Sequence, residues 1–295
     1  EISLGLVGSE MCIRDRPHAY FFPFQHLDNA RKVLPENSKY WQSLDGDWKF
    51  HWAPDPDSRP KDFYQTEYDV SSWDAIPVPS SWNIYGIQKD GSQKYGTPIY
   101  VNQPVIFQHS VKVDDWRGGV MRTPPANWTT YKDRNEVGSF RRDFEIPQDW
   151  DGREVFISFD GVDSFFYLWI NGQYVGFSKN SRNTANFNIT PYLQKGKNTV
   201  AAEVYRSSDG SFLEAQDMFR LPGIFRTVAL YSVPKVHFRD LVATPDLDAT
   251  YTDGSLTVNA EIRNLDKKAI KDYKVYYSLY AVSYTHLTLP TICSV

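Results

Sequence analysis

Hydrophobic and polar residues alternate in short runs along most of the chain, and this alternation is the period of half-buried β-strands. The clearest early run follows a turn at Asp45-Gly46 and places three aromatic residues on one face, Trp48, Phe50 and Trp52. Prolines and serines crowd residues 75–82, which favours an extended edge or a loop. Because no sustained helical period interrupts the pattern, we predict an all-β chain.

The strongest hairpin signal is Asn171-Gly172, which separates two alternating apolar runs. Further alternating runs occupy residues 138–147, 198–205 and 225–233, with turn signals between them. Glycine and proline recur between residues 83 and 137, which predicts a long irregular stretch of the kind that is usually functional or mobile. Antiparallel strands with turn-rich connections favour a jelly-roll (galactose-binding-like) β-sandwich.

The pattern changes after Val233-Pro234. Two cleanly alternating runs, 255–264 and 272–281, are joined by a charged turn and are typical of an immunoglobulin-like sandwich. Such a fold needs about seven strands, and only two or three are present. We therefore expect a first domain over residues 17–233 and a truncated immunoglobulin-like domain over 234–281.

The two ends of the chain differ from the interior in their pattern of hydrophobic and polar residues. Residues 1–16 and 282–295 have no alternation that leads into a neighbouring strand, and they resemble translated adapter sequence. A signal peptide is disfavoured for the first segment, because Glu1 and Glu10 replace a basic start and no long apolar stretch follows. We expect both segments to lie outside the fold and the reading frame to be truncated at both ends.

Composition narrows the class of partner. Aromatic residues make up 16% of the chain, which suits strand cores and also provides flat faces for sugar rings. The net charge is −4 and basic residues are scattered, so neither nucleic acid nor a membrane surface is an expected partner. No apolar run approaches the roughly 20 residues that span a bilayer, so we expect a soluble protein. Its compartment, a bacterial-type cytoplasm or periplasm, stays open.

The cysteines and histidines exclude several chemistries. Both cysteines, Cys12 and Cys293, fall in the end segments, so the interior offers no disulfide, thiolate metal site or cysteine nucleophile. The six histidines show no paired ligand spacing, and we predict no metal site built wholly within the chain.

Five segments occur in an order that resembles the N-terminal sugar-binding domain of family 2 glycoside hydrolases, β-galactosidases most closely, over residues 17–281. They are LDGDWKF (44–50), PVPSSWN (77–83), YGTPIYVNQPV (95–105), FDGVDSFFYLWINGQYVGFSKNSR (159–182) and SDGSFLEAQDMFRLPGIFR (208–226). The resemblance implies a parent enzyme that hydrolyses terminal β-D-galactosyl residues with retention. It also implies Mg²⁺ and Na⁺ as cofactors of that parent and a homo-oligomeric assembly.

A retaining glycosidase needs two carboxylates about 5–5.5 Å apart. The resemblance places both on a (β/α)₈ barrel that this chain does not contain, so we assign no catalytic residue and expect the chain alone to be inactive. By position in SDGS, Asp209 corresponds to the aspartate that contacts the galactosyl ring and a monovalent cation. Asn102, in IYVNQP, corresponds to the asparagine that borders the same subsite.

Other polar and aromatic residues have structural interpretations. We expect Glu203, Glu214 and Asp217 to be turn or surface carboxylates. Arg220 and Arg226 are expected to pair with Glu214 or Asp217. Trp128 and Tyr131 are expected to pack the long loop onto the sandwich.

Two alternatives stay open. The chain could be a stand-alone carbohydrate-binding or structural β-sandwich module, or the parent could be a β-glucuronidase or a β-mannosidase. The gene sequence beyond Tyr280 distinguishes a stand-alone module from part of an enzyme. A downstream barrel supports an enzyme, and a stop codon supports a module.

Overall fold

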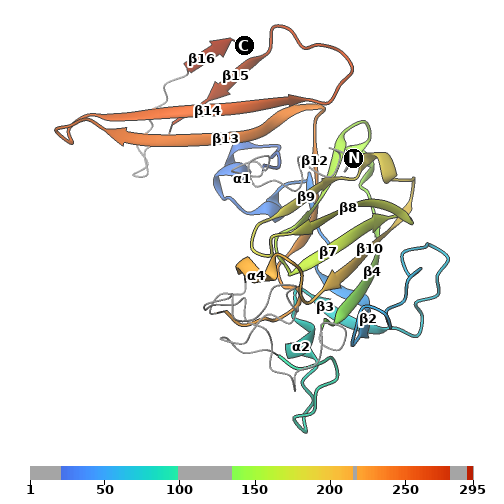
Figure 1. Ribbon diagram of the computed structural model, residues 1–295. Helices are drawn as coiled ribbons and strands as arrows, with labels where there is room; N and C mark the ends of the chain where they lie inside the picture. The colour runs from blue at the N-terminus through green and yellow to red at the C-terminus, as the bar shows by residue number, and fades with distance from the viewer. Residues whose placement is uncertain (1–20, 99–134, 215–217, 280–290, 295) are drawn as a thin grey trace, which may run out of the picture. The chain divides into compact units, whose positions relative to one another are not determined.

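The computed structural model describes residues 21–98, 135–214, 218–279 and 291–294 (Figure 1). The described residues divide into two compact units, one within Phe22–Val233 and one from Pro234 onward. The structure is mostly β, and the paired strands it describes run antiparallel. No helix in these ranges is long and apolar enough to cross a membrane.

The first unit contains two main sheets in its described part. One has the strand order β1 (Trp41–Ser43), β12 (Val228–Val233), β5 (Glu154–Phe159) and β9 (Ala185–Asn188). The other has the order β3 (Asp74–Val78), β2 (Gly46–Ala53), β4 (Val137–Glu145), β10 (Lys197–Tyr205), β7 (Phe165–Ile170) and β8 (Gln173–Lys179). The strand β3 lies at the edge of its sheet, as the prolines of 75–82 predict.

Short elements connect these strands. A small pair joins β6 (Val162–Asp163) to β11 (Gly223–Ile224). The described α-helices are α1 (Leu27–Arg31), α2 (Trp82–Tyr85) and α4 (Ser211–Glu214), and single 3₁₀ turns cover Pro35–Asn37, Gln148–Trp150 and Thr190–Tyr192. The α2 helix overlaps the start of the stretch from residue 83 that was predicted to be irregular.

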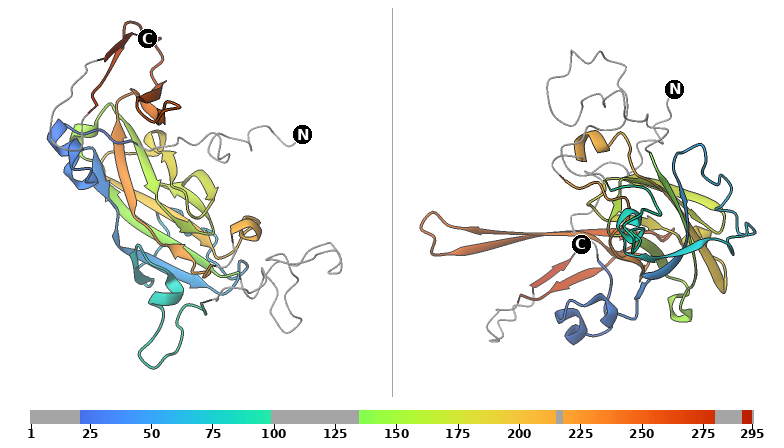
Figure 2. Two further views of the ribbon diagram at one scale, coloured as in Figure 1. Left: turned by 90° about the vertical axis from the view of Figure 1, so that its left-hand side faces the viewer. Right: turned by 90° about the horizontal axis from the view of Figure 1, so that it is seen from below.

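The two sheets share one hydrophobic core, and the layers can be followed in Figure 2. Trp48 and Phe50 on β2 are buried in that core and Trp52 packs against it, which confirms the predicted face. On β7 the alternate residues Phe166, Leu168 and Ile170 point into the core. The period of two read from the sequence is therefore the period of burial.

The predicted hairpin is confirmed at β7 and β8. Ile170 pairs with Gln173, so Asn171 and Gly172 form a two-residue connection. Both have positive φ angles, 50° and 76°, which is the conformation that asparagine and glycine tolerate best. The Asn171 amide also donates to Tyr192 O at 2.9 Å.

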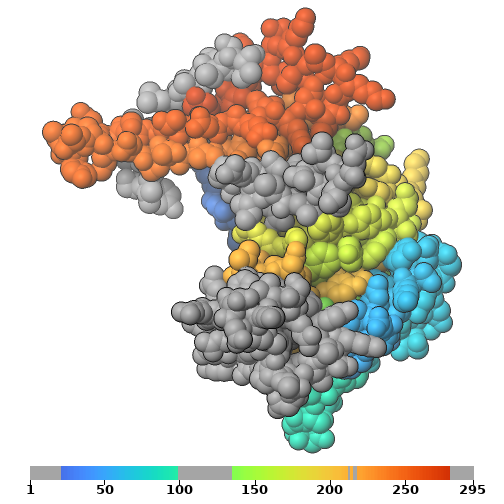
Figure 3. Space-filling model, in the orientation of Figure 1, coloured from blue at the N-terminus to red at the C-terminus, as the bar shows by residue number. Residues whose placement is uncertain are grey.

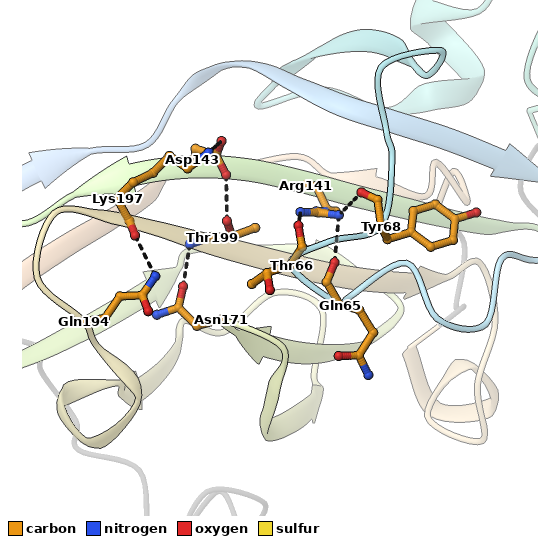
Figure 4. Close-up of polar contacts among 9 residues, drawn as sticks. All are labelled: Gln65, Thr66, Tyr68, Arg141, Asp143, Asn171, Gln194, Lys197 and Thr199. Carbon is orange, nitrogen blue, oxygen red and sulfur yellow. Dashed lines mark hydrogen bonds and ion pairs between the residues drawn. The ribbon is translucent and has the colours of Figure 1, made fainter.

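A covering loop (residues 54–73) lies on the outer face of the six-stranded sheet. Arg141 on β4 donates to the backbone carbonyls of four of its residues, Phe63, Gln65, Thr66 and Tyr68, three of which Figure 4 shows. Tyr64 stacks on Trp169 of β7 with ring centroids 5.0 Å apart. Figure 3 shows this loop, in blue, beside the yellow-green strands. The face that alternation assigns to solvent is thus partly covered.

The second unit is built differently. The strand β13 (Val236–Leu247) pairs with β14 (Gly254–Asn264), and β15 (Lys274–Tyr277) pairs separately with β16 (Thr291–Ser294). The run at 255–264 is a strand, as predicted, and it pairs with β13. Residues 291–294 belong to the end segment that was expected to lie outside the fold. The immunoglobulin-like arrangement stays a prediction.

Candidate functional site

The sequence-predicted residue Asp209 lies just beyond β10, a strand that pairs with β4 on one side and β7 on the other. We call residues 207–211 the Asp209 turn. Ser211 N donates to Ser208 O, and Ser208 N donates to Ser211 Oγ, both at 3.0 Å. The side chain of Asp209 is 73% exposed. A short, internally bonded turn therefore presents a carboxylate to solvent.

Lys179, the last residue of β8, holds this carboxylate. Its Nζ lies 2.7 Å from Asp209 Oδ2, and Gly210 N donates to Oδ1 at 2.8 Å. The hydrogen bond from Lys179 is the main cause that lowers the pKa of Asp209 below its ordinary value. The carboxylate is consequently ionised at neutral pH and still has room to accept hydrogen bonds on its exposed side.

The α4 helix, which follows the turn, is tied to the loop after β8. Glu214 accepts from Ser181 N at 3.1 Å and from Ser181 Oγ at 2.5 Å. Ser181 Oγ also lies 3.5 Å from Asp163 Oδ1. Glu214 is therefore a capping carboxylate that fixes this loop, in agreement with the role expected from the sequence.

Asp163 and Glu214 meet at one hydroxyl and together resemble an acid pair. Burial raises the pKa of Asp163 to about 6, against the opposing charge of Arg182 at 3.7 Å. The cavity that both carboxylates line measures only about 20 Å³, which is the room that one water molecule needs. A sugar ring does not fit there, so these two carboxylates are not a glycosidase pair.

A buried ion pair that the sequence did not predict lies next to the turn. Glu136, just before β4, is 6% exposed and forms a salt bridge with Arg206. The same carboxylate accepts from Trp82 Nε1 at 2.8 Å and Asn83 Nδ2 at 3.0 Å. Arg206 Nη2 also donates to Thr97 O at 2.7 Å. The pair thus joins four segments that are far apart in the sequence.

Glu203 corrects an expectation. It was predicted to be a turn or surface carboxylate, but it lies within β10 and is 4% exposed. Arg59 of the covering loop pairs with it at 3.1 Å, and Tyr205 donates a hydrogen bond at 2.7 Å. Burial by the loop raises the pKa of Glu203 in spite of these partners. The sequence pattern could not show that a loop covers this face.

Arg226 donates hydrogen bonds to the backbone carbonyls of Asp160 and Arg182, and its expected pairing with Glu214 or Asp217 stays a prediction. Four other sequence-predicted residues lie outside the described part of the chain, namely Asn102, Trp128, Tyr131 and Asp217. The predicted proximity of Asn102 to Asp209 therefore stays a prediction.

A cation contact was predicted at Asp209. Both carboxylate oxygens already accept hydrogen bonds, one from an ammonium group. No group of three or more histidine, cysteine or acidic side chains that could hold a metal ion occurs among the described residues. The cation contact at Asp209 therefore stays a prediction.

Comparison with known proteins places this geometry in a family. The model for the sugar-binding domain of glycosyl hydrolases family 2 matches residues 41–234. A β-galactosidase of Priestia megaterium is 41% identical over 267 residues, which is 90% of this chain and 24% of the relative. The β-galactosidase large subunit of Lactobacillus helveticus is 36% identical, over 83% of this chain and 38% of the relative. The chain thus spans about a quarter to two fifths of these relatives.

Solved structures share the fold. A β-glucuronidase of Bacteroides uniformis matches with a TM-score of 0.60 and 20% identity, over 86% of this chain and 26% of that one. A β-glycosidase of Bacteroides vulgatus matches with a TM-score of 0.53 and 23% identity, over 77% of this chain and 25% of that one. Since the family model covers well over half of the chain, this protein belongs to glycosyl hydrolases family 2 and carries its sugar-binding domain.

Proposed function

We propose that the chain is the N-terminal part of a retaining β-galactosidase, an enzyme that hydrolyses terminal β-D-galactosyl residues. The relatives of 36–41% identity are β-galactosidases, and each is matched only in part. The likeness to β-glucuronidases is weaker, 20% identity, and speaks for the fold alone. We further propose that the first unit is the family's jelly-roll sandwich and that the second unit begins an immunoglobulin-like domain.

The observation that carries the proposal is the exposed, ionised carboxylate of Asp209. Carboxylate oxygens accept directional hydrogen bonds from sugar hydroxyls, and such bonds reject an epimer whose hydroxyl points elsewhere. Lys179 holds Oδ2 and Gly210 N holds Oδ1, so the solvent-exposed side of the carboxylate has a defined direction. Binding energy gathered here from the galactosyl ring can be used at the reacting carbon, which the missing catalytic part would hold.

The chain alone is not proposed to catalyse hydrolysis. Of the described acidic residues near Asp209, Glu214 is engaged by Ser181, and Asp163 lines a cavity too small for a sugar. A retaining reaction needs a nucleophile and an acid/base on opposite sides of the scissile bond. Purified chain should therefore release no nitrophenol from nitrophenyl β-galactoside. Turnover that disappears when one of its own residues is changed would contradict the proposal.

A hybrid enzyme tests the role of Asp209. In it, this chain replaces the matching first quarter of the Priestia megaterium β-galactosidase. We expect Asp209→Asn to lower kcat/KM on nitrophenyl β-galactoside by about 10-fold to 100-fold, since a charged hydrogen bond to the substrate is lost. Asp143→Asn is the matched control, because Asp143 pairs with Lys197 at the opposite end of β10.

Three outcomes are informative. Equal activity of both hybrid variants would refute the substrate role of Asp209. Loss of activity on the galactoside together with activity on a glucuronide would favour the β-glucuronidase alternative. Saturable galactose binding by the isolated chain, with no activity in any hybrid, would favour a stand-alone module.

A further inference from the structure

The position of Asp209 depends on where the chain leaves β10. The β4–β10 ladder ends at the pair Val137–Tyr205. Beyond it, Arg206 N donates to Glu136 O at 3.0 Å, and Ser207 N donates to Asn135 Oδ1 at 2.9 Å. Asp209 follows only two residues later. A movement of the backbone at residues 206 and 207 would therefore also move the Asp209 carboxylate.

The contact between Asp209 and Lys179 requires the chain to follow one particular path after β10. The strand order is β10, β7, β8, and Lys179 ends β8. The Asp209 turn must therefore cross the end of β7 to bring Oδ2 within 2.7 Å of Lys179 Nζ. On the way, Ser208 Oγ and Ser211 Oγ each approach Ser164 Oγ, at 3.3 Å and 3.4 Å. These neutral contacts are weaker than charged ones, so they are poor candidates for setting the exit direction.

The buried pair Glu136–Arg206 lies where it can set the direction in which the chain leaves β10. Its carboxylate is held by Trp82 and Asn83, which fixes Glu136 against α2. Its guanidinium is held by that carboxylate and by Thr97 O. A side chain on Gly96 would overlap the Glu136 carboxylate, so the site is tightly fitted around this group. Arg206 is thus anchored through both its backbone and its side chain.

We propose that Glu136 and Arg206 are a positioning pair, which holds the Asp209 turn in the geometry needed to meet a sugar. This inference deepens the proposed function and rests on it for the identity of the ligand. The pair touches no substrate atom in this scheme and acts only through the turn. Breaking it should release Asp209 from Lys179 without unfolding the strands.

The first test follows the carboxyl group of Asp209 by NMR during a pH titration of the full chain. In Glu136→Gln we expect the pKa of Asp209 to rise toward its ordinary value, because the Lys179 contact loosens. The variant also leaves the Arg206 charge without its partner, and that charge alone would lower the pKa of Asp209. The direction of the shift therefore separates release of the turn from direct electrostatics.

The second readout is amide hydrogen exchange in the turn and in α4. Ser211 N donates to Ser208 O, and Leu213 N and Glu214 N donate to Gly210 O. We expect these amides to exchange about 10-fold faster in Glu136→Gln, since local opening becomes easier. The double variant Glu136→Gln, Arg206→Met should act in the same direction. It removes both buried charges together and so retains the fold if the single variant does not.

The matched control is Glu203→Gln. Glu203 lies on β10, the strand that leads to Arg206, and is also a buried glutamate paired with an arginine, Arg59, but it faces the covering loop. Its loss should lower global stability and leave both the pKa of Asp209 and the exchange of the turn unchanged. Unchanged readouts in both Glu136 variants, or equal changes in Glu203→Gln, would overturn the proposal. Neither readout involves sugar, so failure of the proposed function in the hybrid enzyme is distinguishable from failure here.

Discussion

The first unit and the β13–β14 ribbon of the second unit have equally regular strand pairing but differ in what their side chains cover. In the first unit, inward residues of two sheets form one core. In β13 and β14 nearly every described side chain is at least partly exposed, including Phe238, Leu247 and Leu256. Backbone pairing therefore does not distinguish the two, and burial does. A two-stranded ribbon is marginally stable by itself.

The largest expected difference concerns a phenylalanine in each unit. Phe166 is 2% exposed and packs between Phe159 and Phe187, so Phe166→Ala should cost about 3–5 kcal/mol of the free energy of unfolding. Phe238 is 39% exposed, and Phe238→Ala should cost under about 0.5 kcal/mol. Urea unfolding followed by circular dichroism, which reports on the strands of both units, measures both costs. Similar costs for the two variants would show that the ribbon is packed in solution.

The second comparison uses pH. The pKa of Asp163 is raised to about 6, so the native state keeps a proton that the unfolded state releases near its ordinary pKa of 3.8. Stability from this group is therefore greatest below pH 3.8 and is lost as pH rises toward 6, by at most about 3 kcal/mol. Asp163→Asn should gain in stability relative to the native chain between pH 4 and 7.

The matched aspartate of the second unit is Asp248, which is exposed and whose pKa is lowered by a hydrogen bond from Thr250. Asp248→Asn should leave the pH dependence of the tryptophan-monitored transition unchanged. A flat difference between Asp163→Asn and the native chain would mean that water reaches Asp163 more freely than its burial indicates.

The third comparison is between one arginine of each unit, Arg141 and Arg239. Arg141 supplies hydrogen bonds to four carbonyls of the covering loop, and Arg141→Met should cost about 2 kcal/mol and expose the loop to protease. Arg239 on β13 forms an ion pair with Glu261, which is half exposed, and Arg239→Met should cost under about 1 kcal/mol. Urea unfolding and limited proteolysis measure the two effects. Intact resistance of the loop in Arg141→Met would assign its anchoring to the Tyr64–Trp169 stack instead.

Local signals in the sequence predicted the parts of the first unit that depend on neighbouring residues. The turn at Asn171 and Gly172 needs only those two residues to adopt positive φ. The alternation of Trp48 and Phe50 needs only a pleated strand. The segment SDGS singled out Asp209 through a family resemblance, and its role at a sugar site stays a proposal.

Contacts between distant segments could not be predicted in this way. Glu136 and Arg206 are 70 residues apart, and nothing near either one in the sequence requires a buried partner. Glu203 occupies an outward position on β10, and only the folded covering loop turns that position into a buried one. Both are buried charges, which are tolerated only where tertiary structure provides the opposite charge.

The pairing of β1 with β12 has a consequence for synthesis. Trp41 near the start of the described chain pairs with Tyr231, and Asp45 accepts from Val228 N at 2.9 Å. The segment between β1 and β12 is long, so its two ends meet slowly, whereas the β7–β8 hairpin forms from adjacent residues. During synthesis on the ribosome, β1 has no partner strand until β12 has emerged as far as residue 233. Nascent chains halted before that point should therefore recruit chaperones, and chains halted after it should not.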